Sequence, residues 1–340
     1  MPKEHFGRQT EESLAELAVA LKRATEQMRD IAINLLDSRS WRFACIVFGA
    51  THRAGHYLWD RSELPDIYEC VDAALGALID RAPAGTMVLA FAVHGMGPNR
   101  GWSDLLPEIL ARMEEHKSGR APKRGWLYWL KQELPYHWVR PILKALPAGV
   151  TDRLVQLWSR RMYDWAETRY FPMPMDDAGY LRINLRGRER EGIVGAGAEY
   201  DEVCAEIETL VASLRDEASG QPIAGQAVRA YRDADPRSPS SRLIPDLIFP
   251  WTGPAASSTQ RLISTLLPGF GFDVPLWLPS GRSGNHRDVG WFVAAGPGIR
   301  GGTEVNGYHV MDLLPTILKY LGRDADPRLS GRPIAAVAGK

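Results

Sequence analysis

Two short, uninterrupted apolar runs constrain the fold of this 340-residue chain more than any other feature. They span residues 43–48 and 87–93, and each is too short for a helix. Such runs are typical of strands that are buried on both faces of a parallel sheet. Apolar residues at helical spacing precede both runs, over residues 10–37 and 66–81. The resulting order of helix, strand, helix, strand predicts an α/β fold.

The amino-acid composition changes in the next segment, residues 97–178. It is rich in tryptophan, arginine and proline, and we expect a mainly helical cap inserted into the fold. Its basic and aromatic side chains suit a nucleotide, a glycan or a lipid headgroup, or else they pack the small core of the cap itself. The predicted division is 1–96 for the first part of the α/β core, 97–178 for the cap and 179–340 for the second part. Further strands are expected at 180–185, 227–231, 246–249 and 290–295, and helices at 199–215 and 313–321.

The composition excludes several classes of protein. The chain carries 41 basic and 41 acidic side chains, so no overall field attracts nucleic acid or an anionic membrane. No apolar run approaches the roughly 18 residues of a transmembrane helix, and the polar N-terminus lacks the apolar core of a secretory signal. The three cysteines are widely spaced and predict neither a disulfide framework nor a cysteine zinc site. We therefore expect a cytoplasmic protein that binds no nucleic acid and has no transmembrane segment.

Four histidines lie next to the predicted strands: His52, His56, His94 and His286. Neutral imidazole is the commonest side-chain metal ligand, and open α/β sheets gather their ligands at the carboxyl ends of strands. His52 and His56 are four residues apart and face one side of a helical turn. Together with His286 they supply three nitrogens, the ligand count of a catalytic zinc that keeps one open position. The sequence thus predicts one zinc ion, with hydrolysis by hydroxide generated at neutral pH.

Three other side chains are candidates for contact with the substrate. His94 is expected to orient or protonate a substrate oxygen. Arg53 and Arg287 adjoin the predicted ligands, and each could pair with a phosphate through two hydrogen bonds or with a surface carboxylate. A simpler interpretation stays open, in which the histidines line a polar pocket and hold no metal.

Five segments, in this order along most of the chain, resemble the alkaline phosphatase superfamily, and specifically its type I phosphodiesterase/nucleotide pyrophosphatase-like branch of predicted phosphohydrolases and phosphomutases. The resemblance implies an alkaline phosphatase-like core with a central, mostly parallel sheet between helices, and two metal ions bound by aspartates and histidines. The segments are Phe48–Trp59 (similar to a TDxxxH motif), Ala92–Met96 (SDHG), Asn184–Val194 (NLxGREpxGIV), Gly284–Arg287 with Gly296–Ile299 (GxHRxxG…GPGI), and Asp312–Leu318 (DxxPTIL).

The chain also departs from the pattern of this family. His52 and Val93 stand where the family has metal-binding aspartates, and Ala92 replaces a serine. Valine binds no cation, so His94 is the one matched ligand of the second ion, and we expect that second site to be empty. The N-terminal aspartate and Thr/Ser nucleophile of the family have no counterpart here. Three alternatives follow: the chain is a fragment, it is half of a split protein, or it has lost the original reaction.

Two functions are compatible with these matches to the family pattern and departures from it. The first is a metal-dependent hydrolase that acts on a small-molecule phosphodiester or other phosphoester through a degenerate, single-zinc site. The alternative is a catalytically silent member of the superfamily that binds a phosphorylated ligand or a partner chain. A complementing chain that bears the missing nucleophile is a special case of this alternative.

Overall fold

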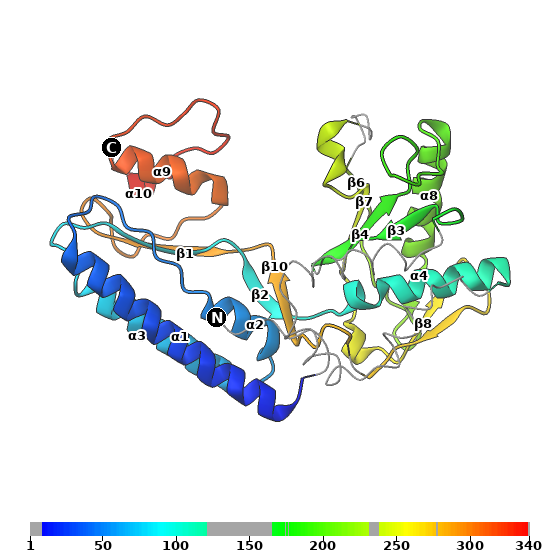
Figure 1. Cartoon of the computed structure of the whole chain (residues 1–340), viewed down its shortest axis with the longest axis horizontal. Coiled ribbons are helices and arrows are strands. Elements are labelled where there is room, and N and C mark those ends of the chain that lie inside the picture. Colours follow the sequence, from blue (N-terminus) through cyan, green and yellow to red (C-terminus); the bar gives the residue numbers. More distant parts are fainter. Residues whose placement is uncertain are drawn as a thin grey trace. The chain divides into compact units, whose positions relative to one another are not determined.

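The computed structural model describes residues 9–120, 165–230 apart from 174 and 176, 238–276 and 278–338. The chain divides into two compact units (Figure 1). Thr10–Pro98 and the residues from Ser283 onward form the first unit, and Asn99–Arg282 form the second. Most of the predicted cap lies outside the described residues, so the three-part division of the chain stays a prediction.

The first unit combines helices with short pairs of antiparallel strands (Figure 1). Strand β1 pairs with β11, and β2 pairs with β10. The predicted helices and the two predicted strands at 87–93 and 290–295 are confirmed here. The elements are α1 (Glu11–Ser38), α2 (Ala50–Tyr57), α3 (Glu63–Ile79), β1 (Val88–Ala92), β2 (Gly95–Pro98), β10 (Gly284–Arg287), β11 (Trp291–Ala295), a 3₁₀ turn at Val310–Asp312, α9 (Leu313–Tyr320) and α10 (Ala335–Ala338).

Helices α1 and α3 pack side by side and run parallel. The Nζ atom of Lys22 in α1 lies 2.8 Å from a carboxylate oxygen of Asp66 in α3. A second ion pair joins Asp37, in the last turn of α1, to Arg81 just after α3, also at 2.8 Å. Both pairs join residues 44 positions apart, so the two helices keep the same direction and register. The chain must therefore return between them, and it does so through residues 39–49 and α2.

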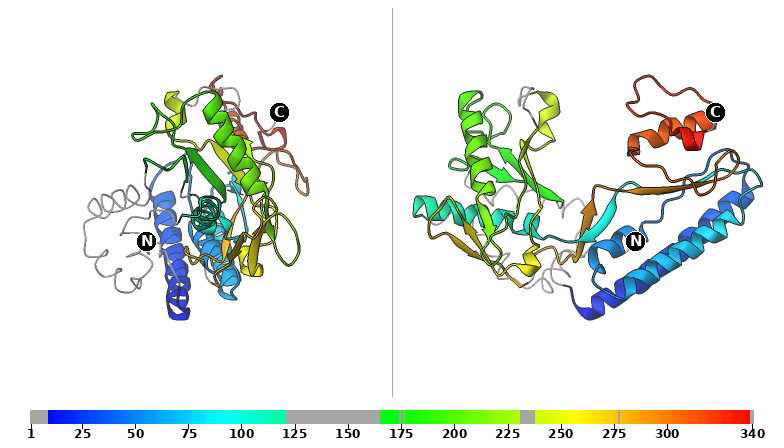
Figure 2. Two further views of the ribbon diagram at one scale, coloured as in Figure 1. Left: turned by 90° about the vertical axis from the view of Figure 1, so that its right-hand side faces the viewer. Right: turned by 180° about the vertical axis from the view of Figure 1, so that it is seen from behind.

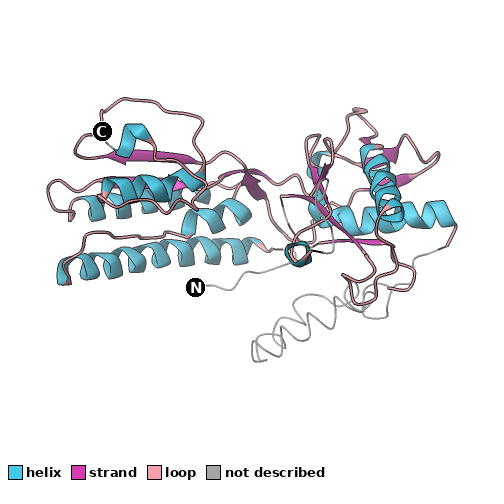
Figure 3. Ribbon diagram, turned by 90° about the horizontal axis from the view of Figure 1, so that it is seen from above, coloured by secondary structure: helices cyan, strands magenta, loops and turns pink. Residues whose placement is uncertain are grey.

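The prediction of a strand at residues 43–48 is wrong. These residues form an extended loop between α1 and α2 (Figure 3), and the structure gives them no strand partner among the described residues. The side chains of Phe43 and Val47 are 55% and 71% exposed, respectively. An apolar run shows that a segment favours a strand, but it does not show which strand lies beside it.

The prediction of a central, mostly parallel sheet is also wrong. Every sheet within the described ranges is small and antiparallel, and parallel pairing is limited to two isolated bridges near residues 185–194. The reason is visible at β1, which pairs with β11 near the end of the chain rather than with the earlier apolar run.

The second unit packs helices α4 and α8 against two antiparallel sheets (Figure 2). One sheet has the strand order β3-β4-β7-β6 and the other the order β5-β8-β9. The buried side chains of Trp102 and Ile109 from α4, Ile207 from α8 and Leu181 from β4 meet in its core. The elements are α4 (Trp102–Ser118), β3 (Tyr170–Pro172), β4 (Ala178–Ile183), α8 (Ala198–Ala212), β5 (Leu214–Asp216), β6 (Val228–Arg229), β7 (Leu247–Pro250), β8 (Arg261–Ser264), β9 (Gly271–Asp273) and 3₁₀ turns at Pro239–Arg242 and Ala256–Ser258.

A buried carboxylate, that of Asp246, ties β4 to the turn that follows it. Asp246 accepts hydrogen bonds from both terminal guanidinium nitrogens of Arg188, at 2.7 and 2.6 Å. It also accepts from the Tyr200 hydroxyl at 2.8 Å and from the backbone N–H of Ile183 at 2.7 Å. The side chains of Arg188 and Asp246 are 0% exposed. This network fixes the turn that carries part of the family-like segment Asn184–Val194.

The thiol of Cys204 in α8 is expected to resist alkylation in the folded protein. Burial raises its pKa to about 12, so at pH 8 its thiolate fraction is roughly 10³-fold below that of an ordinary exposed thiol. Cys45 is exposed and should react with iodoacetamide under the same conditions. Mass spectrometry of peptides labelled before and after unfolding measures the difference. Equal labelling of Cys204 and Cys45 in the folded state would contradict this arrangement of α8.

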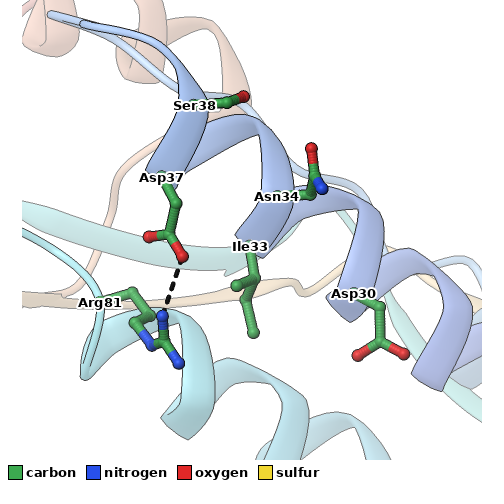
Figure 4. Close-up of a pocket in the computed structure, with 6 residues that line it drawn as sticks. All are labelled: Asp30, Ile33, Asn34, Asp37, Ser38 and Arg81. Atoms are coloured by element: carbon green, nitrogen blue, oxygen red, sulfur yellow. Dashed lines mark hydrogen bonds and ion pairs between the residues drawn. The ribbon is translucent and has the colours of Figure 1, made fainter.

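A surface hollow of 490 Å³ lies along α1 near the end of α3 (Figure 4). It contains the ion pair between Asp37 and Arg81 and none of the four histidines. The lining residues are Asp30, Ile33, Asn34, Asp37, Ser38 and Arg81. The hollow therefore belongs to the packing of the two helices and not to the histidine cluster.

Among the described helices, none combines the length and the apolar character that crossing a membrane would require.

Candidate metal centre

Three of the predicted ligands come together from α2 and β10, both in the first unit. The ring centroids of His52 and His56 in α2 are 4.8 Å apart. The ring of His286 in β10 lies 5.1 Å from that of His52 and 4.8 Å from that of His56. One nitrogen from each ring can be chosen so that all three lie within 4.8 Å of one another. The cluster therefore unites residues that are far apart in the sequence.

His94 lies at one side of this cluster. It stands between β1 and β2, and β2 pairs with β10 so that Met96 is opposite His286. The ring centroid of His94 is 4.2 Å from that of His286 and 5.2 Å from that of His52. The strand pairing thus brings the fourth predicted histidine to the other three, as the sequence analysis expected for residues near strand ends.

Helix α2 and strand β10 approach each other closely because glycine lies at their contact. A Cβ atom on Gly284 would be 1.9 Å from the carbonyl oxygen of Gly55. Two hydrogen bonds stabilise the contact: the Ser283 N–H donates to the His56 carbonyl at 2.9 Å, and the Trp59 N–H donates to the Ser283 hydroxyl at 3.0 Å. The spacing of the histidines therefore depends on a position that tolerates no side chain.

Replacing Gly284 with alanine is expected to separate α2 from β10 and to disperse the histidines. The added methyl group forces the backbone apart, at a cost of about 1–3 kcal/mol in unfolding free energy. The zinc affinity should fall together with the melting temperature. Replacement of Gly49, whose added Cβ would meet nothing within 4 Å, is the matched control and should change zinc affinity little. Zinc titration and thermal unfolding measure both effects, and unaltered zinc affinity in G284A would contradict the close contact.

Backbone carbonyls orient two of the imidazole rings. Nδ1 of His56 lies 3.1 Å from the Gly284 carbonyl oxygen, and Nδ1 of His94 lies 3.0 Å from that of Gly95. A carbonyl only accepts, so each Nδ1 carries the proton, and Nε2 of the neutral ring carries the lone pair. Metal-binding histidines usually donate the N–H of their second ring nitrogen to a carbonyl or carboxylate oxygen in this way. The backbone of β10 therefore both supplies His286 and sets the tautomer of His56.

The donor set fits zinc. The three imidazoles are neutral nitrogen ligands, and the group contains no carboxylate among the residues that the structure describes. Imidazole suits zinc, copper, iron and nickel, whereas magnesium and calcium prefer oxygen ligands. Nitrogens bound to one tetrahedral zinc lie about 3.4 Å apart, so the three imidazole nitrogens would move closer together when they bind the ion. His56 is 3% exposed while His52 and His286 are half-buried, so the cluster is open on one side.

The two arginines differ in their surroundings. The guanidinium of Arg287 donates to the carbonyl of His286 at 2.8 Å and also to the carbonyl of Pro98. A Cβ atom on Gly97 would lie 2.6 Å from its Nε, so the guanidinium covers that glycine. Arg53 follows His52 in α2 and is half-buried. A role of Arg53 and Arg287 in substrate binding stays a prediction.

The sequence analysis missed two positions that support the histidines. The Gly284 carbonyl orients His56, and the Asn285 side chain, which is buried, accepts a hydrogen bond from the His286 N–H at 2.8 Å. In the sequence, only their position one and two residues before His286 could have indicated this support.

Val93 stands where the family has a metal-binding aspartate, and its side chain is 54% exposed.

Comparison with known proteins agrees with the motifs in the sequence. A family model described as type I phosphodiesterase / nucleotide pyrophosphatase matches residues 4–261, a range that includes His52, His56 and His94 and ends before His286. Neither the curated proteins nor the solved structures give a match. Since the matched range is well over half of the 340 residues, the chain belongs to the type I phosphodiesterase/nucleotide pyrophosphatase family of the alkaline phosphatase superfamily.

Proposed function

We propose that this protein is a hydrolase of a phosphodiester or other small-molecule phosphoester and works with one zinc ion held by His52, His56 and His286. The convergence of these three side chains from α2 and β10 is the observation that carries the proposal. Membership of the family supports phosphoester chemistry. The proposal also includes the cytoplasmic location expected from the sequence.

The bound ion would supply a Lewis acid that polarises a phosphoryl oxygen and lowers the pKa of water. Nδ1 of His94 is held by the Gly95 carbonyl, so its Nε2 is the nitrogen that can accept a proton from water or donate one to the leaving oxygen. Arg53 would bind the phosphate from α2. Arg287 would do so from β10 after its guanidinium leaves the Pro98 carbonyl.

Metal content and turnover test the proposal together. Protein purified without a histidine tag should hold about one zinc ion per chain. It should hydrolyse bis(p-nitrophenyl) phosphate, p-nitrophenyl phosphate, or both. His94→Ala should keep the zinc and lower the turnover rate by roughly 10²–10⁴-fold. Absence of bound zinc after zinc is added back would overturn the single-zinc site. About two ions per chain would also contradict it.

Two observations favour the alternative of a silent binding protein. Among the residues that the structure describes, the cluster has no carboxylate, and the exposed Val93 stands where the family binds its second metal. In that case the chain would bind inorganic phosphate at the histidine cluster, measured by calorimetry, without hydrolysing either ester. A complementing chain with a Thr or Ser nucleophile would then restore turnover. Turnover by the isolated chain would exclude this alternative.

A further inference from the structure

Strand β11 has a free edge that is unusually apolar. In the described part of the chain it pairs with β1 on one side and with no strand on the other. The side chains of Trp291 and Val293 are 53% and 62% exposed, and Ala295 on the same face is exposed as well. Proteins usually protect an edge strand with charged residues, proline or a bulge. The span Trp291–Ala295 contains none of these.

This edge is complementary to a second copy of itself. Two antiparallel strands can pair about a two-fold axis because the same residues meet from both sides. With the axis at Val293, each Trp291 lies opposite Ala295 of the second copy, so large and small side chains alternate across the pair. Charge does not oppose the association, since the 41 basic and 41 acidic residues give the chain no net charge.

We propose that β11 pairs with β11 of a second copy of this chain, so that β1 and β11 of both copies form one continuous antiparallel sheet. The occupant of the edge is thus another molecule of the same protein. The pairing satisfies the outward N–H and C=O groups of β11 and places Trp291 of each copy beside Ala295 of the other. It goes beyond the proposed function and does not depend on it.

A symmetric crosslink tests the register. In a Cys45→Ser background, which removes an exposed thiol, Val293→Cys should form a disulfide-linked dimer under mild oxidation, because the two sulfur atoms meet at the axis. Val289→Cys is the matched control: Val289 is 80% exposed and precedes β11. Its two copies would lie roughly 27 Å apart in the same register and should not crosslink. Equal crosslinking of both variants would indicate random collision and overturn the proposal.

Sedimentation of the unmodified chain tests the dimer itself. The wild type should sediment as a dimer at micromolar concentration, and Val293→Lys should raise the dissociation constant at least tenfold, since it places two ammonium groups at the axis. Val289→Lys should leave the dimer unchanged. Both variants should keep the wild-type circular dichroism and zinc content, so failure of this proposal is distinguishable from failure of the metal site. A wild type that stays monomeric, or a V293K variant that stays dimeric, would overturn the pairing.

Discussion

Replacing His286 with alanine is expected to reduce the zinc content from about one ion per chain to near zero while the fold is retained. Two imidazoles then remain in α2, and zinc sites in proteins normally use three or four protein ligands. Loss of a residue that only supports a ligand already costs 10–100-fold in affinity, so loss of the ligand itself should cost at least roughly 100-fold. Elemental analysis and competition with a chromogenic chelator measure the change.

His116→Ala is the control for this experiment. His116 lies in the second unit, and its Nε2 is 3.0 Å from the carbonyl oxygen of Pro268. The variant removes one imidazole from the chain but none from the cluster, so its zinc content should equal that of the wild type. Equal zinc loss in both variants would show non-specific binding to histidine. Full zinc content in H286A would show that the ligands lie elsewhere.

The second large effect is expected at Arg188. Replacing it with methionine leaves the carboxylate of Asp246 buried without its cation, although the hydroxyl of Tyr200 still donates to it. Removing one partner of a buried ion pair costs about 3–5 kcal/mol of unfolding free energy. Chemical denaturation followed by tryptophan fluorescence should show this loss in the unfolding transition of the second unit.

One control at an exposed ion pair and one double variant separate the effect of charge from that of packing. Arg112→Met makes the same substitution in an exposed pair with Glu108, and its effect should be small because exposed ion pairs contribute little. Arg188→Met combined with Asp246→Leu removes both charges and should recover part of the lost stability. If R188M is as stable as the wild type, the network around Asp246 does not hold the turn after β4.

The helices of this chain were predictable because their signals are local. Apolar spacing placed α1, α3, α8 and α9 close to their observed bounds. The pairing of the strands was not predictable in the same way, because the local sequence of a strand does not show which other strand lies beside it. Residues 43–48 have a stronger apolar run than β11, yet β11 is the strand that pairs with β1.

The clustering of the histidines was predictable from the sequence, whereas the groups that support them were not. The histidines stood out because imidazole is rare and because each adjoined a predicted strand. The support comes from groups without a sequence signature, namely the carbonyl of Gly284 and the small size that lets this residue contact Gly55. Backbone groups are present at every residue, so only the fold shows which of them face a ligand.

The order of the ligands along the chain has a consequence for synthesis. A ribosome delivers His52 and His56 before His286, and the whole segment Asn99–Arg282 is synthesised between them. A nascent chain that stops before β10 offers two imidazoles and lacks the carbonyl that orients one of them. Zinc capture at the proposed site would therefore wait until the segment Asn99–Arg282 has been synthesised, and chains truncated before residue 284 should bind zinc weakly.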